Sequence, residues 1–306
     1  MTLDSPHGIA VAAGSLIDVS SGGAVLHKGE TRAGKGGDVA RAGAPEVEGA
    51  KGALALAGQL RGYGMAGGGT LMLETDGKVV IGGVDALANR QANTPTGAAQ
   101  PQPLLLDPSL LRAGFAKYDI NASGGLRVAE GATLDVAMPV YRYEPGNEAT
   151  GQQAPALLLA PVYQENPLKG ALTQRAGADL TLRSQRIDDG ADIDIGVGAR
   201  VSVDPGRTIR LLGGGNSRIT VDGALRARRA NEADIVAPAS DVRDNPASRT
   251  HNRAIWIGGA ATLDVAAAPP VAWTSTTPLR PGAGGRHHPA GRRAGLGRDR
   301  HRRERP

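Results

Sequence analysis

The sequence contains no cysteine, which excludes disulfides, thiol catalysis and thiolate metal sites. Aromatic residues make up only 3% of the chain, although 40% of it is hydrophobic, so few large rings are available to fill a globular core. The 45 glycines and 20 prolines do not follow a G-X-Y period, which excludes a collagen-like chain. What remains suits an architecture of many tight corners and small, stacked aliphatic side chains.

Long hydrophobic runs are also missing. No stretch of eighteen or more apolar residues occurs, so we predict that no helix of this chain spans a membrane. The N-terminal stretch MTLDSPHGIAVAAGS has neither a basic region nor a long apolar run, so it is not a signal peptide. We therefore expect this chain to lack an export signal of its own.

The net charge of +5 is unevenly distributed. Residues 274–306 hold nine arginines and two acidic residues, a balance of +7, which leaves about −2 for residues 1–273. This Arg/Gly/Pro-rich tail has no apolar pattern, and we expect it to be disordered. It is either a basic arm for nucleic acid or an anionic surface, or a gene read out of frame beyond Trp273. The abrupt loss of pattern there favours the second interpretation, so we predict no nucleic-acid partner.

Four short segments between residues 190 and 227 share one pattern, in which a polar residue separates two apolar ones. These doublets are Ile193/Ile195, Val201/Val203, Ile209/Leu211 and Ile219/Val221, separated by Asp194, Ser202, Arg210 and Thr220. Because side chains alternate along a strand, each doublet points to one face and its polar residue to the other. Gly, Asn, Asp and Pro fill the gaps, where the chain must turn. The pattern predicts short strands with one apolar face.

Similar doublets occur through residues 1–273, namely Ile17/Val19, Leu54/Leu56, Leu71/Leu73, Val79/Ile81, Leu126/Val128, Leu134/Val136 and Leu180/Leu182. Many short strands with one apolar face form either a sandwich or a solenoid. Paired aliphatics with few aromatics favour the solenoid, with about ten coils at ~20 residues each. We expect one all-β domain over residues 1–273, from which irregular loop excursions project near 85–108, 144–177 and 231–252.

Two further features refine this prediction. The best helix candidate is Leu104–Phe115, where Asp107 could cap one short turn that Pro108 opens. An x-T-L-D-V-A strand followed by Pro and an aromatic residue occurs twice, at Gly131–Tyr143 and at Ala260–Trp273.

Three glycine-rich motifs suggest ligand sites only weakly. Gly29–Gly36 matches a phosphate-binding loop, but Gly36 replaces its Ser/Thr and no apolar helix follows. Gly62–Gly67 matches the dinucleotide fingerprint GxGxxG, but a strand pattern follows it in place of a helix. Gly34–Val39 fits part of one calcium-binding nonapeptide, which needs several stacked copies.

Polar candidates are equally weak. Asp188, Asp189, Asp192 and Asp194 could bind calcium and act on acidic polysaccharide, but turn-forming aspartates on a solvated face are favoured. The isolated His7, His27 and His251 have no second ligand at metal spacing. Asn121–Ser123 is a glycosylation sequon by pattern only, and no GxSxG elbow occurs. We therefore assign no catalytic, cofactor-binding or metal residue, no cofactor and no enzymatic activity.

Four stretches carry a family resemblance, namely GSLIDVSSGGAVLHKGE (14–30), GKGGDVAR (34–41), LALAGQLRGYGMAGGGTLMLETDGKVVIGG (54–83) and LRAGFAKYDINASGGLRVAEGATLDVAMP (111–139). They resemble the large filamentous haemagglutinin-like exoproteins that Gram-negative bacteria secrete by the two-partner route. The similarity covers about residues 1–273 in preserved order. It is nearest to an internal domain of unknown function in those proteins, so no catalytic residues are carried over.

The resemblance implies a right-handed parallel β-helix, export of the full-length protein through an outer-membrane two-partner transporter, and a role in adhesion or surface display. The expected partners are then host or bacterial surface glycans or proteins. The family's secretion domain is missing here and the tail departs completely, which fits a fragment of a longer gene. The alternative is a β-helical carbohydrate-active enzyme, resembling a polysaccharide lyase or hydrolase, that uses the aspartates of residues 188–194.

Overall fold

The computed structural model describes residues 1–4, 9–25, 30–42, 54–83, 103–142, 156–166, 171–185, 191–214, 217–228, 234–236 and 254–266. Over these ranges the chain is all-β, and the only helical element described is a short 3-10 helix, η2 (Pro108–Arg112). No helix in these ranges is long and apolar enough to cross a membrane. All of the ranges belong to one unit, Met1–Ala268.

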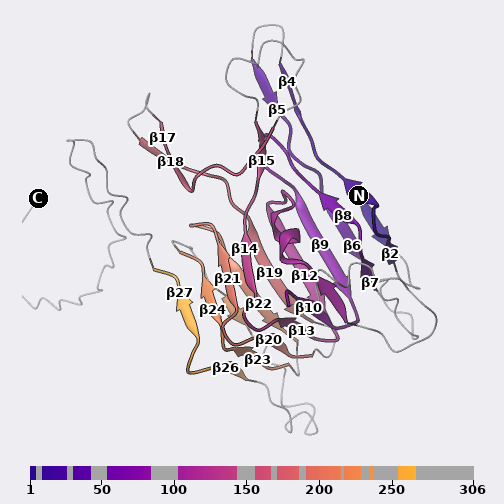
Figure 1. Ribbon diagram of the computed structural model, residues 1–306, viewed down its shortest axis with the longest axis vertical. Coiled ribbons are helices and arrows are strands. Elements are labelled where there is room, and N and C mark those ends of the chain that lie inside the picture. Colours follow the sequence, from indigo (N-terminus) through magenta and orange to yellow (C-terminus); the bar gives the residue numbers. More distant parts are fainter. Residues whose placement is uncertain are drawn as a thin grey trace, which may run out of the picture. The chain divides into compact units, whose positions relative to one another are not determined.

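Three parallel sheets carry most of the described strands (Figure 1). The first has seven strands, in the order β1 (Thr2–Asp4), β6 (Val39–Ala42), β9 (Thr70–Thr75), β12 (Lys117–Ala122), β19 (Asp179–Ser184), β22 (Ile209–Gly213) and β25 (Asp234–Val236). The second has six, in the order β11 (Leu104–Leu106), β10 (Val79–Ile81), β13 (Leu126–Val128), β20 (Ile193–Ile195), β23 (Ile219–Val221) and β26 (Ile255–Ile257). The third has four, in the order β14 (Thr133–Val136), β21 (Arg200–Val203), β24 (Ala224–Arg226) and β27 (Thr262–Asp264).

The remaining strands form two-stranded sheets. Two of these are parallel: β2 (Ile9–Val11) with β7 (Leu54–Leu56), and β3 (Leu16–Asp18) with β8 (Gln59–Arg61). Three are antiparallel: β4 (Gly23–Val25) with β5 (Thr31–Ala33), β15 (Val140–Arg142) with β16 (Ala156–Leu158), and β17 (Tyr163–Asn166) with β18 (Ala171–Gln174). The antiparallel pairs lie between parallel strands in the chain and add no strand to the parallel sheets.

From β12 onward the chain visits the seven-, six- and four-stranded sheets in the same order four times. The circuits differ in length, because the chain between Thr133 of β14 and its partner Arg200 of β21 is far longer than that between Arg200 and its partner Ala224 of β24. The longer circuit contains β15 to β18. The largest sheet among the described residues has seven strands, fewer than the roughly ten stacked layers that the sequence predicted.

Most of the predicted doublets form the core, whereas Ile17, Val19 and Leu56 are only partly buried against it. Ile193, Ile195, Ile219 and Val221 are fully buried, while Ser202 and Thr220 on the opposite face are not. Like residues stack across neighbouring strands, as in the row Val79, Leu126, Ile193, Ile219 and Ile255. Inward residues of all three parallel sheets belong to one hydrophobic cluster. The doublets therefore do what the alternation of apolar and polar residues predicts.

The short turn predicted at Asp107 and Pro108 is confirmed, although Leu104–Leu106 of the helix candidate form strand β11. The side chain of Asp107 accepts a hydrogen bond from the backbone N–H of Ser109 at 2.7 Å, and Pro108 opens the 3-10 helix. The two T-L-D segments form β14 and β27 of the same four-stranded sheet. The repeat thus marks one sheet position, reached once per circuit of the chain.

Parts of the predicted excursions are ordered strands. Residues 104–106 form β11 and belong to the six-stranded sheet, and residues 234–236 form β25. Residues 156–158, 163–166 and 171–174 form antiparallel pairs. Most of the first and third excursions, and the whole tail at 274–306 with the boundary before it, lie outside the described residues.

Candidate functional site

The parallel sheets are interrupted next to β7 and β8. Strand β7 lies beside β11, but the two belong to different sheets and are not joined by a ladder. The 3-10 helix η2 lies between the ends of β8 and β14, since Gly62 after β8 donates to the carbonyl of Ala113 at 2.9 Å and Ala137 after β14 donates to that of Leu111. Among the described strands no ladder joins β8 to β14, so the parallel sheets are interrupted at η2.

A cavity of about 290 Å³ lies at this interruption. Its apolar lining includes leucines from four elements, and its polar lining combines hydrogen-bond donors and acceptors. The lining residues are Leu56, Gly58, Gln59, Leu60, Arg61, Tyr63, Leu105, Leu106, Asp107, Ser109, Leu110 and Ala113. Apolar walls with a few convergent polar groups are typical of small-molecule sites.

Backbone groups also face the interruption. Leu104 donates to the carbonyl of Lys78 at 2.8 Å and Leu106 accepts from Gly82 at 3.0 Å, so both residues bond toward β10. Leu105 lies between them, and successive residues of a strand direct their N–H and C=O groups to opposite sides. The backbone of Leu105 therefore points away from β10, toward β7. By the same alternation, the backbone N–H and C=O of Leu56 point away from β2, because the N–H of the next residue, Ala57, donates to the carbonyl of Val11 in β2. The cavity thus lies between two strand edges.

Tyr63 is held firmly at the cavity wall. Its backbone N–H donates to Ser20 Oγ at 3.1 Å, and its ring meets the ring of Tyr141 edge-on with centroids 5.6 Å apart. Its ring also lies directly against Gly114, where φ is +91° and an added Cβ would overlap the ring. Contacts on both sides therefore fix the ring before any ligand arrives.

The charges of the residues that line the cavity are balanced, and the phenol of Tyr63 is protonated. Arg61 and Asp107 contribute one charge of each sign to the lining. Arg61 Nη2 donates to Gln59 Oε1 at 2.9 Å, which orients the guanidinium. Burial raises the pKa of the Tyr63 phenol, although Arg61 partly opposes this effect. The phenol therefore remains a hydrogen-bond donor at neutral pH.

The glycine motifs serve close packing between corners. Gly62–Gly67 joins β8 to β9, and no helix follows it. Gly36 donates to the carbonyl of Gly67 at 2.9 Å, and an added Cβ on Gly36 would overlap the carbonyl of Gly62. Within the described part of Gly29–Gly36, which omits Gly29, the chain leads into β6 and not into a helix. Neither segment has the geometry of a phosphate loop.

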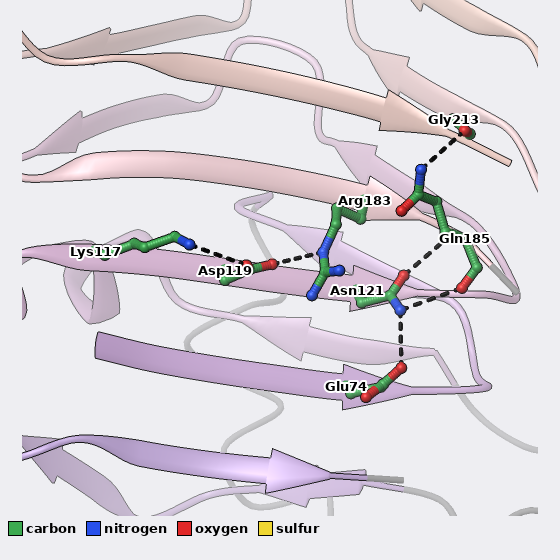
Figure 2. Close-up of polar contacts among 7 residues, drawn as sticks. All are labelled: Glu74, Lys117, Asp119, Asn121, Arg183, Gln185 and Gly213. Carbon is green, nitrogen blue, oxygen red and sulfur yellow. Dashed lines mark hydrogen bonds and ion pairs between the residues drawn. The ribbon is translucent and has the colours of Figure 1, made fainter. Parts of the chain in front are cut away.

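A polar network crosses the outer face of the seven-stranded sheet (Figure 2). Asp119 accepts from Arg183 Nε at 2.7 Å and lies 3.6 Å from Lys117 Nζ, with its side chain only 7% exposed. Asn121 Nδ2 donates to Glu74 Oε1 at 2.9 Å and to the carbonyl of Gln185 at 3.2 Å. These groups bond one another across strands, so the network fixes strand register and leaves little polar surface for a ligand.

The environment of Asn121 bears on the glycosylation sequon at Asn121–Ser123. The residue is 5% exposed, and its amide nitrogen already donates two hydrogen bonds. A buried, engaged amide cannot accept a glycan in the folded chain. The sequon at Asn121–Ser123 is therefore a structural motif.

The acidic cluster is neutralised where it is described. Asp192 accepts from the backbone N–H of Arg218 at 2.8 Å and pairs with its guanidinium at 3.4 Å. Asp194 lies 3.3 Å from Arg127 Nε. Residues 188 and 189 lie outside the described ranges, as do His7, His27 and His251. No group of three or more potential metal ligands occurs among the residues that the structure describes.

The sequence did not single out the cavity. Asp107 was recognised only as a helix cap, and Tyr63 only as a member of a glycine motif. Arg61 and Ser109 carried no local signal, because the lining comes from segments 56–63 and 105–113, which meet only through folding. The one available clue was the helix cap at Asp107, which predicted a break in the strand pattern.

Comparison with known proteins gives no relative for this chain. No protein-family model, no characterised protein and no solved structure matches it.

Proposed function

We propose that this chain is a right-handed parallel β-helix and forms part of a secreted or surface-displayed adhesin of the filamentous haemagglutinin-like type. Its role is non-catalytic. The helical body provides a stiff support, and the elements that interrupt it make contact with host or bacterial surfaces. In the full-length parent, export would require an outer-membrane two-partner transporter.

The recurrent order of the three sheets is the observation that carries this proposal. Four successive circuits place equivalent strands side by side in parallel register, for example β13, β20, β23 and β26. The first three of these circuits add their inward apolar residues to one hydrophobic cluster, and the fourth, whose Ile255 and Ile257 are exposed, continues the rows at the edge. Such stacking of like residues at strand spacing is what a β-helix requires. The preference of parallel crossovers for one hand supports the right-handed form.

Side elements supply surfaces for adhesion. The pairs β15–β16 and β17–β18 are inserted between β14 and β19, and Leu157, Leu158 and Leu172 on them are 48%, 45% and 37% exposed. Arg175, just after β18, pairs with Asp204 at 2.6 Å and donates to the carbonyl of Ala160 at 2.8 Å. This ion pair anchors the inserted segment to the turn after β21. Loops held on a rigid support are where recognition usually resides.

A cell-binding assay tests the proposal. Beads coated with the full chain are expected to adhere to cultured epithelial cells or to bacterial cells, and soluble chain should compete. Beads coated with the Ile195→Asp variant provide the control, because a charge in the dry core disrupts the support. Adhesion that is absent for the folded chain, or equal for the two preparations, would count against the adhesin.

A secretion assay tests the export route separately. The chain is fused behind a two-partner secretion domain and produced with and without the matching pore. Appearance outside the cell only with the pore is expected. Retention in the periplasm in both cases would remove the support for this route.

A further inference from the structure

We propose that the cavity between β7–β8 and β11–η2 binds one uncharged sugar ring of a glycan. This inference rests on the proposed adhesin function and names the ligand class and the site. The cavity is distinct from the inserted pairs β15–β18, whose exposed leucines offer only apolar contact.

The size of the cavity limits the ligand. About 290 Å³ is at the small end of the range for small-molecule sites, so one ring fits and a chain of rings would extend outward. The walls are formed by fixed elements, since Tyr63 is held between Gly114 and Tyr141 and Asp107 caps η2. A preformed site loses little entropy on binding.

The hydrogen-bonding groups match a polyol. Each sugar hydroxyl both donates and accepts, so a site for it needs both kinds of group. Arg61 and the Tyr63 phenol donate, Asp107 accepts, and the hydroxyl of Ser109 can do either. The backbone groups of Leu56 and Leu105 face the same space.

The charge and the apolar surface of the cavity lining restrict the class of ligand further. Arg61 and Asp107 carry opposite charges, so the lining has no net charge with which to select an anion. Leu60 and Leu106 are buried and Leu56 and Leu110 are half-buried, which provides an apolar wall for the C–H face of a sugar ring. A wholly apolar ligand would displace water from the polar groups of the lining without offering hydrogen bonds in return, and an acidic sugar would meet the carboxylate of Asp107.

The experiment uses methyl glycosides of glucose, galactose, mannose and N-acetylglucosamine as probes of the full chain. Saturation-transfer NMR detects binding, and amide shifts of Arg61, Tyr63 and Ser109 locate it. At least one glycoside is expected to bind and to shift these amides. Methyl glucuronide and cyclohexylmethanol serve as anionic and apolar comparison probes, and we expect each to bind at least tenfold more weakly than the best neutral glycoside.

Three variants test the location. Ser109→Trp fills the mouth from an exposed position and should weaken binding at least tenfold. Val197→Trp, at an exposed turn after β20, is its matched control and should change nothing. Asp107→Asn keeps a capping side chain but removes the charge, and should weaken binding about three- to tenfold.

The outcomes separate the two proposals. The sugar site is overturned if no glycoside shifts the three amides, if Ser109→Trp binds as well as wild type, or if glucuronide or cyclohexylmethanol binds best. If glycosides fail but coated beads still adhere to cells, the adhesin stands and the cavity assignment falls. If glycosides bind and beads do not adhere, the sugar site stands alone.

Discussion

Gly68 shows why single glycines matter in this chain. It lies where the segment after β8 passes the segment before β12, and a Cβ added there would overlap the backbone carbonyl of Gly114. Backbone on both sides cannot move aside as the end of a flexible side chain can. The glycine is therefore required by close approach of two corners.

Gly68→Ala is expected to destabilise the chain by about 2–3 kcal/mol or more, because the added methyl group overpacks the corner. Gly22→Ala is the matched control, since its added Cβ has open space and its φ is not positive. It should change the free energy of unfolding by less than about 0.5 kcal/mol. Urea titrations of both variants followed by circular dichroism measure the difference. Similar losses for the two would contradict the corner packing.

Tyr118 provides a second residue-scale test. Its ring lies in the core beside Phe115 with centroids 5.9 Å apart, and its hydroxyl has no hydrogen bond of normal geometry among the described residues. Burial strongly raises the pKa of this phenol, although the nearby backbone of Phe115 opposes the shift in part. The folded chain thus holds Tyr118 protonated at pH values where an unfolded tyrosine, with a pKa of about 10, ionises.

A raised pKa in the folded state makes stability fall with pH. Below about pH 10 both states hold the proton and the stabilisation is complete. Above that, the unfolded state loses its proton first, so the free energy of unfolding should decrease as pH rises through the alkaline range. Tyr118→Phe should reduce this slope and cost less than about 1 kcal/mol at neutral pH, because no hydrogen bond is lost. Urea titrations across the alkaline range test both points, and an unchanged slope would contradict the assignment.

At the scale of elements, the two faces of a strand should respond differently. Ile195 in β20 is fully buried and lies in register with Val128 and Val221. Ile195→Asp should cost several kcal/mol, because it places a charge among aliphatic side chains. Asp194→Asn, next to it, should cost less than about 0.5 kcal/mol, because its side chain is 38% exposed and its pair with Arg127 is solvated. Thermal melts that show equal losses would contradict the assignment of faces.

The elements that the sequence predicted and those that it missed differ in pattern. Doublets such as Ile219/Val221 revealed strands because alternation is a local signal. Strand β6 reads Val-Ala-Arg-Ala, with Val39 as its one large aliphatic residue, and β11 is an unbroken Leu run, so neither shows the doublet pattern. The cavity was missed for a related reason. Its shape depends on how η2 packs beside β8, which no local spacing encodes.

At the scale of the whole molecule, protection should vary along the stack. In the second sheet, Ile219 is 0% exposed, whereas its partner Ile255 in β26 is 43% exposed. Leu225 and its partner Leu263 in β27 show the same contrast, at 7% and 48%. Amides of β20 and β23 should therefore exchange hydrogen much more slowly than those of β26 and β27. Exchange measured by NMR or mass spectrometry tests this, and uniform protection would contradict the stacked arrangement.

Strand β14 pairs with β21 in parallel register although two antiparallel pairs, β15–β16 and β17–β18, lie between them in the chain. Strand β21 pairs with β24 in the same way across a much shorter connection. Strand register in this architecture is thus insensitive to the length of chain between circuits, since loop closure becomes only slowly costlier with length. The exposed strands β16 to β18 of the longer circuit are therefore a natural place for evolutionary change. Foreign peptides grafted there could be exchanged for one another without redesigning the strands of the parallel sheets.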